Sequence, residues 1–274
     1  MKIGAKVLLL TDFSQVSGYA TDYALEIASK LKAKVEILHI LNTPVDWVKL
    51  AKEKEQYYPE TLRAIGSAKS KLNSVVEKFQ RAGVTTTSSL VFNFGPENVQ
   101  DHVQKAGSDL VIMGSSGLQG SKSFRVIGSN AQRVLRNVKV PVLVVKKGNG
   151  KPEIKTIAFA TTLLENQKKS FLILKEFAAL LGAKINLVFI NTPYNFVETE
   201  EFEKRLEKFG NTEDVTLINA LDLELGIIFL EKKNRPDVIV TAKTEKFGVS
   251  RIIDPSFTEN LVRMYDLPVL SFHI

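Results

Sequence analysis

The chain has 274 residues, of which 44% are hydrophobic and 24% charged, the composition of an ordinary globular protein. It contains no cysteine, which excludes disulfides, thiolate nucleophiles and cysteine-ligated metal sites. No apolar run approaches the roughly 20 residues that cross a bilayer, and the run at 7–10 is too short for the core of a signal peptide. We therefore expect a cytoplasmic protein without a membrane anchor.

Short apolar runs alternate with longer amphipathic stretches through the first half. The apolar runs lack polar alternation, which is typical of parallel strands buried on both faces. The longer stretches place apolar residues at helical spacing. This alternation predicts a parallel sheet covered by helices. In chain order the predicted elements are strand 6–11, helix 15–31, strand 35–40, helix 60–81, strand 88–93, helix 97–106, strand 109–113, helix 129–138 and strand 141–145.

The second half repeats the first. Five segments match in the same order, with offsets between 127 and 150 residues. A collinear set of this kind indicates a duplication. We expect two tandem Rossmann-like α/β domains, 1–147 and 151–274, each with a five-stranded parallel sheet flanked by helices. The matching segments are 6–12 with 156–162, 33–40 with 183–190, the Asn-Thr-Pro tripeptides 42–44 with 191–193, 109–113 with 237–241, and 140–145 with 267–272.

The last strand of each half predicts how the halves meet. Residues 146–152 (KKGNGKP) are a linker by composition. Pro141 and Pro268 stand near the start of these strands, and proline belongs at an edge strand or a strand beginning. An uncovered apolar edge would promote aggregation. We therefore expect 141–145 to pair with 268–272, giving an intramolecular pseudo-dimer. A further homodimer and unidentified protein partners stay open.

A glycine-containing loop follows the strand at 109–113. Glycine lets the backbone approach a phosphate closely, and residues 128–130 (GSN) open a predicted helix whose N-terminus presents free N–H groups to an anion. The same residues are also typical of a surface loop that ends in a good helix cap. The side chains that could donate to an anion are Ser115, Ser116, Ser129 and Asn130, with Lys122 and Arg125 nearby.

Over nearly all of both halves the sequence resembles the universal stress protein family. ATP-binding members carry an aspartate after the first strand and, after the fourth, two glycines separated by two residues, then nine residues and Gly-Ser or Gly-Thr. This chain has Asp12, and it has Gly114, Gly117 and the pair at 128–129. The resemblance implies an adenine nucleotide alpha hydrolase-like fold that binds ATP, with magnesium, or AMP. It implies these nucleotide-binding residues: Thr11, Asp12, Ile40, Met113, Gly114, Gly117, Gly128, Ser129 and Asn130.

One departure from the family pattern lies inside the loop. Ten residues separate Gly117 from Gly128 instead of nine. The extra residue can bulge outward, with Gly120 absorbing it, or it can disrupt the phosphate cradle. The two possibilities favour different functions, a nucleotide-binding regulator or a scaffold that acts through protein partners.

The second half departs further. Ala242, Glu245 and Pro255 stand where the first half has its three glycines, and Thr162 replaces Asp12. A glutamate would repel a phosphate, and a proline lacks the N–H that could bind one. We expect no nucleotide in the second half, which contributes the pairing surface.

Little in the sequence points to catalysis. His39 lies in an apolar strand, His102 on a predicted helix and His273 at the C-terminus, so we expect structural roles. No histidine pair has metal-ligand spacing, and a Walker A loop is absent. The resemblance allows slow ATP hydrolysis at most. We therefore expect a binding protein, not an enzyme; an adenine-nucleotide enzyme is a third alternative that fold similarity alone does not support.

The charge distribution raises nucleic acid as a rival ligand. Residues 1–147 carry 21 Lys and Arg against 12 Asp and Glu, whereas 148–274 carry 16 against 18. Single-strand binding would need aromatic side chains interleaved with basic ones. Trp47, Tyr57 and Tyr58 do lie among lysines at 49, 52 and 54. This segment is also where the chain is expected to loop out before the helix at 60–81, so we expect no nucleic-acid binding.

Overall fold

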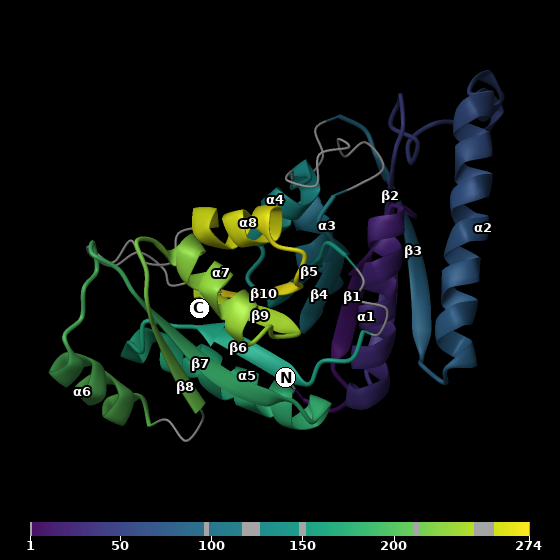
Figure 1. Cartoon of the computed structure of the whole chain (residues 1–274). Helices are drawn as coiled ribbons and strands as arrows, with labels where there is room; N and C mark the ends of the chain where they lie inside the picture. The colour runs from purple at the N-terminus through teal and green to yellow at the C-terminus, as the bar shows by residue number, and fades with distance from the viewer. Residues whose placement is uncertain are drawn as a thin grey trace.

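The computed structural model describes residues 2–95, 99–116, 127–147, 152–210, 214–243 and 255–273. Within them, ten strands form one sheet with helices on both faces (Figure 1). The strands are β1 (Lys6–Leu10), β2 (Lys34–Asn42), β3 (Thr86–Asn93), β4 (Leu110–Gly114), β5 (Val142–Val145), β6 (Thr156–Ala160), β7 (Lys184–Asn191), β8 (Asp214–Asn219), β9 (Val238–Lys243) and β10 (Val269–His273). The helices are α1 (Gln15–Leu31), α2 (Pro59–Arg81), α3 (Val99–Ala106), α4 (Ser129–Asn137), α5 (Lys168–Leu181), α6 (Thr199–Phe209), α7 (Leu223–Lys233) and α8 (Pro255–Met264), with short 3-10 helices η1 (Lys52–Tyr57) and η2 (Glu165–Gln167).

The strand order is β3-β2-β1-β4-β5-β10-β9-β6-β7-β8. Each half therefore contributes five strands with the same internal order, and all pairings within a half are parallel. The edge strands β3 and β8 lie at opposite ends of the molecule, next to α2 and α6 (Figure 1). This confirms the predicted fold of two tandem Rossmann-like units.

Most predicted elements of the first half agree with the structure to within two residues at each end. The helix at 15–31 has the predicted bounds, and the helix predicted at 97–106 is described from Val99 onward. The prediction that all strands are buried on both faces is wrong for β3, whose side chains are mostly half-exposed or exposed. The reason is its position, since β3 is the first strand of the sheet order and has only one neighbouring strand. The linker residues 148–151 lie outside the described residues.

The two halves are joined by the strand pairing expected from the prolines. β10 runs antiparallel to β5, with Leu270 opposite Leu143 and Val269 opposite Val144. Both prolines precede their strands, and their carbonyls still accept hydrogen bonds, Pro141 from Val111 and Pro268 from Ile239. Because each proline precedes its strand, its missing N–H removes no hydrogen bond from within the strand. The apolar edge strands β5 and β10 then cover each other.

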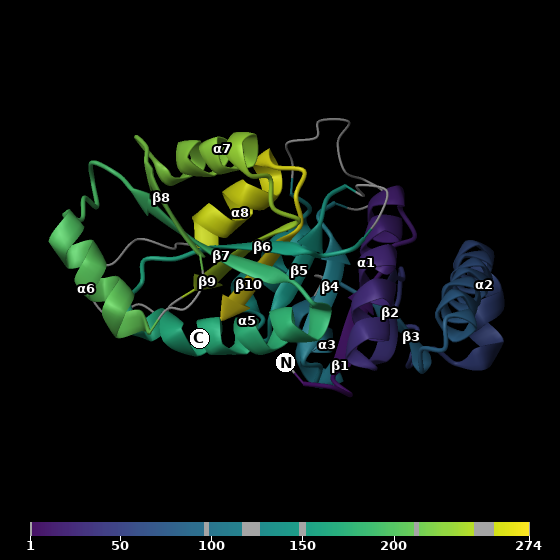
Figure 2. The ribbon, with the colours of Figure 1, turned by 60° about the horizontal axis from the view of Figure 1, so that its bottom comes forward.

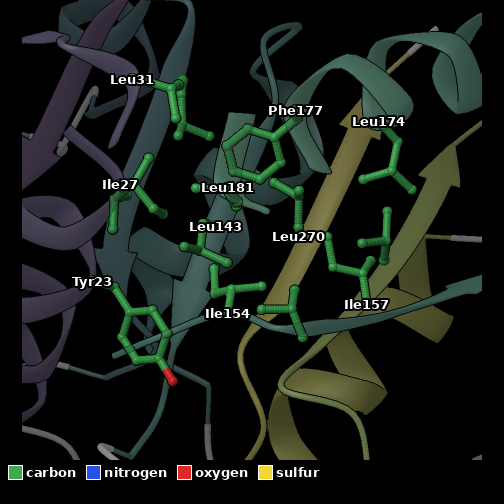
Figure 3. Close-up of a cluster of buried hydrophobic side chains, with 14 of the residues drawn as sticks. Tyr23, Ile27, Leu31, Leu143, Ile154, Ile157, Leu174, Phe177, Leu181 and Leu270 are labelled. Atoms are coloured by element: carbon green, nitrogen blue, oxygen red, sulfur yellow. The ribbon is translucent and has the colours of Figure 1, made fainter. Parts of the chain in front are cut away.

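On one face of the sheet, the core runs without a break across the joint. Tyr23 and Ile27 of α1 and Phe177 of α5 belong to one buried cluster with Leu143 and Leu270 (Figure 3). Each of these side chains is at most 2% exposed. Burial, with Asp237 of the other half as a second cause, raises the pKa of Tyr23 above its usual value. The halves therefore share one hydrophobic core on this face.

On the opposite face the halves meet through α4 and α8 (Figure 1). Glu259 of α8, with a side chain 9% exposed, accepts hydrogen bonds from Arg136 Nε at 2.5 Å and Nη2 at 2.9 Å. It also accepts one from Gln132 Nε2 at 2.7 Å. Both donors belong to α4 of the first half. Figure 2 shows α7 and α8 on one side of the second-half strands and α5 on the other.

We predict that Glu259→Ala lowers the free energy of unfolding by about 1.5–3 kcal/mol, because hydrogen bonds to a charged group contribute in this range. The matched control is Glu77→Ala, whose carboxylate pairs with Arg81 at 3.1 Å within one exposed helix turn. That change is expected to cost less than about 0.5 kcal/mol. Urea unfolding followed by circular dichroism measures both, and equal losses would contradict the cross-half role of Glu259.

Candidate functional site

The residues expected to bind a nucleotide meet at the carboxyl end of the first-half sheet. Thr11 and Asp12 follow β1, Ile40 lies near the end of β2, and Met113 and Gly114 end β4. β1 pairs with β2 on one side and β4 on the other, so these positions are neighbours. The chain order of the strands reverses between β1 and β4, and ligands of open α/β sheets bind at such a point.

The turn after β1 is held by its own side chains. Ser14 is the N-cap of α1, and its Oγ accepts from the N–H of Ser17. One carboxylate oxygen of Asp12 accepts from the N–H of Ser14 at 3.0 Å. Thr11 Oγ1 accepts from the N–H of Phe13, which has a left-handed φ of 63°. Ser14 therefore caps α1, and Asp12 stabilises the turn before it.

Gly114 packs tightly where β4 ends against the start of α1. A Cβ added there would lie 3.1 Å from Val16 Cγ1, 3.2 Å from the backbone N of Ser17 and 3.3 Å from the backbone C of Val16. Two of these three atoms belong to the backbone and cannot rotate away. The need for glycine at this position is therefore explained by packing, before any ligand is considered.

The two ends of the glycine-containing loop are tied together. Ser115 donates its N–H to the carbonyl of Val145, and Gly128 donates its N–H to the carbonyl of Ser115 at 2.7 Å. Gly128 is the N-cap of α4, and among the described residues no side chain makes a cap hydrogen bond to this helix. The N–H of Gly128 is therefore engaged within the protein, whereas the first N–H groups of α4 lack a side-chain cap.

Two buried polar atoms lie next to this loop without partners. Ser115 Oγ and Asn130 Oδ1 make no hydrogen bond with any described residue. Ser115 is 1% exposed, Asn130 half-buried and Ser129 exposed. Buried polar groups are nearly always hydrogen-bonded, so unpaired ones at the end of a sheet are candidates for ligand contact. Gly117, Lys122 and Arg125, which the sequence placed in this loop, lie outside the described residues.

His39 is a neighbour of the site that sequence reasoning regarded as structural. Its Nδ1 lies 2.8 Å from the carbonyl oxygen of Thr11, so Nδ1 is the protonated nitrogen. Its ring centroid is 4.4 Å from that of Phe13, and Lys71 Nζ lies 5.5 Å from the Phe13 centroid. Burial lowers the pKa of His39 below its usual value of 6.5, and the nearby positive charge of Lys71 lowers it further. The hydrogen bond to the Thr11 carbonyl and the charge of Asp12 act in the opposite direction but are outweighed. His102 lies on α3, and the side chain of His273 lies outside the described residues.

The aromatic segment after β2 does not form a stacking surface. Trp47 is only 8% exposed and contacts the rings of Tyr58 at 6.1 Å and Phe92 at 6.3 Å. Tyr57 is 73% exposed but stands without a described aromatic contact. The candidate nucleic-acid residue Trp47 is thus buried in a core, which argues against base stacking by this segment.

A pocket opens at the corresponding place in the second half, at the carboxyl end of β6 and β7. It contains about 450 Å³ of space, part of it open to solvent. Its lining is mostly apolar and includes Val188, Ile190, Val197, Leu223 and Phe257. Thr161, Thr162, Asn195 and Arg205 supply the polar part.

The hydroxyls of this pocket are arranged by one buried amide. Gln167 is 1% exposed, and its Oε1 accepts from Thr161 Oγ1 at 2.8 Å, from Thr162 Oγ1 at 3.0 Å and from the N–H of Thr162 at 2.8 Å. Three residues are expected to disfavour a phosphate site here. Ala242 lies one residue before the end of β9, Pro255 begins α8, and Glu245 lies outside the described residues.

Within the described ranges there is no group of three His, Asp or Glu side chains that could hold a metal ion. The described helices likewise include none with the length and apolar character of a membrane span.

We predict that Gly114→Ala lowers the free energy of unfolding by about 1–3 kcal/mol, because the added Cβ has to displace backbone atoms of α1. The matched control is Gly66→Ala in α2, where nothing lies within 4 Å of an added Cβ. There alanine favours the helix and is expected to raise stability by about 0.5–1 kcal/mol. Denaturant unfolding measures both, and a neutral Gly114→Ala would contradict the packing explanation.

We predict that stability falls on acidification through the titration of His39. The fold favours the neutral imidazole, so this contribution is fully present above the usual pKa of 6.5 and is lost as the pH falls through the lowered folded-state value. The free energy of unfolding, measured at about pH 7.5 and about pH 5, should fall less between these two pH values in His39→Gln than in wild type. An NMR titration that gives His39 a pKa above 6.5 would contradict this.

Comparison with known proteins agrees with this geometry. The model of the universal stress protein family matches residues 5–146. A universal stress protein of Methanocaldococcus jannaschii is 29% identical over 143 residues, covering 52% of this chain and 82% of the relative. One from Synechocystis is 22% identical over 291 aligned residues, covering 97% of this chain and 99% of the relative.

Solved structures share the whole fold. A universal stress protein from Archaeoglobus fulgidus has a TM-score of 0.72 at 18% identity and covers 98% of each chain. A Pseudomonas aeruginosa protein of unknown function has a TM-score of 0.71 at 15% identity, covering 98% of this chain and 92% of that one. At these identities the structures support the fold alone. The family match, which spans more than half of the chain, shows that this protein belongs to the universal stress protein family, in a tandem two-domain form, and is a stress-response protein.

Proposed function

We propose that this protein is a stress-response regulator that binds an adenine nucleotide, ATP or AMP, in its first half only. The observation that carries the proposal is the pair of buried polar atoms Ser115 Oγ and Asn130 Oδ1 beside the start of α4, which have no hydrogen-bond partner among the described residues. A hydroxyl and free helix N–H groups donate to phosphate oxygens. An amide oxygen accepts from a ribose hydroxyl. The donor and acceptor set therefore fits a nucleotide.

Each residue of the proposed site has a role that follows from its position. Thr11, Ile40 and Met113 lie at the strand ends, where they would contact the base. Gly114, Ser129 and Asn130 lie at the phosphate end, with Gly117 and Gly128 as the other glycines of the loop. Asp12, which follows β1, would help to hold a magnesium ion that arrives with ATP, since such ions use one carboxylate together with phosphate oxygens. The nucleotide supplies the signal, and the protein acts by binding it, with slow hydrolysis at most.

The second half differs at the positions that matter for this ligand. Thr162 stands in place of Asp12, and the alignment of Pro255 with Gly128 places Phe257 where the first half has Asn130. Phe257 is 5% exposed and lines the second-half pocket. An aromatic ring in place of an amide offers no hydrogen bond to a ribose or a phosphate. This supports the restriction of nucleotide binding to the first half.

A second candidate is a scaffold that binds protein partners without a nucleotide. Two of the glycines do not require a ligand, because Gly114 is explained by packing against α1 and the N–H of Gly128 is engaged with Ser115. The additional residue between Gly117 and Gly128 also favours this alternative.

Thermal unfolding with and without Mg-ATP or AMP distinguishes the two candidates. A nucleotide at about 100 times its Kd should stabilise the protein by ~2.7 kcal/mol, a shift of several degrees. Gly117→Asp and Asp12→Ala should each abolish this shift. The matched control is Thr162→Ala at the corresponding position of the second half, which should retain it.

The protein must first be shown free of co-purified nucleotide, by heat extraction and chromatography. No shift at millimolar nucleotide would then reject the proposal in favour of the scaffold. A shift that Thr162→Ala abolishes and Asp12→Ala retains would instead place the nucleotide in the second half.

A further inference from the structure

We propose that the second-half pocket binds a small apolar carboxylic acid, an aryl or branched alkyl chain that ends in one carboxylate. The pocket is a partly open hollow, and the 450 Å³ of space within it includes open solvent. Small-molecule sites combine an apolar lining with a few oriented polar groups. This inference does not depend on nucleotide binding by the first half.

The body of the ligand is indicated by the apolar lining. Val188 of β7 and Phe257 of α8 are at most 5% exposed, and Ile190 and Leu223 are half-buried. Phe257 occupies the position of Asn130, so the second half presents a ring where the first presents an amide. The pocket therefore favours an apolar group over a ribose or a phosphate chain.

The head of the ligand is indicated by charge. Among the described residues that line the pocket, Arg205 of α6 alone is charged. Its Nε donates to Glu201 at 2.7 Å, and neither of its terminal nitrogens bonds to a residue that the structure describes. Its side chain is 23% exposed and that of Glu201 is 52% exposed. Arginine binds carboxylates in a bidentate manner, so Arg205 is the lining residue best suited to hold a carboxylate.

Two threonine hydroxyls also line the pocket. Thr161 and Thr162 both donate to the amide oxygen of Gln167, and Thr161 Oγ1 also accepts from the N–H of Leu163 at 3.0 Å. Since both hydroxyl hydrogens are engaged, the carboxylate is bound by Arg205, and a water molecule can donate to Thr162. By contrast, a phosphate monoester would find one arginine and no helix N–H at Pro255, where proline has no donor.

Exposed apolar side chains neighbour the lining residues in the sequence. Asn195 and Val197 line the pocket from the segment between β7 and α6, and the intervening Phe196 is 68% exposed. Tyr194 is 91% exposed and Leu221, just before α7, is 70% exposed. Exposed side chains of this size beside a pocket are typical of a ligand-binding surface.

The test uses two probes that differ only at the head, 4-phenylbutyrate and 4-phenylbutanol. Calorimetry measures their affinities for the full chain, and backbone amide NMR locates them. We expect chemical-shift changes at Thr161, Thr162 and 188–190, with the carboxylate bound more tightly. Arg205→Gln should lower the affinity for phenylbutyrate by a factor of about 10 or more, because a charge-assisted hydrogen bond is lost. It should leave the affinity for phenylbutanol unchanged.

The matched control is Lys204→Gln. Lys204 neighbours Arg205 on α6 and likewise pairs with a glutamate one turn earlier, Glu200 at 2.7 Å, but it does not line the pocket. The Lys204→Gln variant should bind both probes as tightly as wild type. Leu223→Trp places a larger side chain in the pocket from a half-buried position and should lower the affinity for both probes. Unfolding curves confirm that each variant is folded.

Absence of binding by either probe at millimolar concentration would overturn the proposal. So would shifts confined to other parts of the chain, or an equal loss of phenylbutyrate affinity in Arg205→Gln and Lys204→Gln. Shifts at Thr161 and Thr162 caused by Mg-ATP and competing with phenylbutyrate would also overturn it, and would identify the pocket as a nucleotide site.

Discussion

The antiparallel pairing of β5 with β10 is the interaction on which the rest of the structure depends. A parallel five-stranded unit leaves an edge at its last strand, and here that strand is apolar in both halves. Exposure of such an edge would invite pairing with other chains. In this chain the two edge strands pair with each other, with Leu143 opposite Leu270. One sheet and one shared core on the α1 and α5 face follow from this pairing.

The contact between the halves also links the candidate site of the first half to the pocket of the second half. α4 begins at the glycine-containing loop of the first half and carries Arg136 and Gln132, which bind Glu259 of α8. α8 in turn carries Phe257, which lines the pocket of the second half. The halves have kept the same fold and site position, while Asn130 and Phe257 present opposite chemistry there. Corresponding positions of the two halves thus lie at the same end of the sheet and carry different side chains.

Much of the fold could be predicted from the sequence because it rests on local patterns. Apolar runs, helical spacing and the repeat predict the elements, and Pro141 with Pro268 predicts the joint. The motif indicated where the candidate site lies. It did not indicate why position 114 favours glycine, because the close approach to Val16 exists only after β4 packs against α1. The pairing of Arg136 with Glu259 joins residues 123 positions apart. The burial of Trp47 depends on its contact with Phe92, which no local pattern indicates.

The central proposal is that the two halves of one fold bind differently, with a nucleotide held in the first half alone. Calorimetric titration of nucleotide-free protein with Mg-ATP tests this most directly, because it counts sites as well as measuring affinity. The account predicts one site per chain, lost in Asp12→Ala and retained in Thr162→Ala. A stoichiometry of two per chain, or no binding at millimolar ATP, would contradict it.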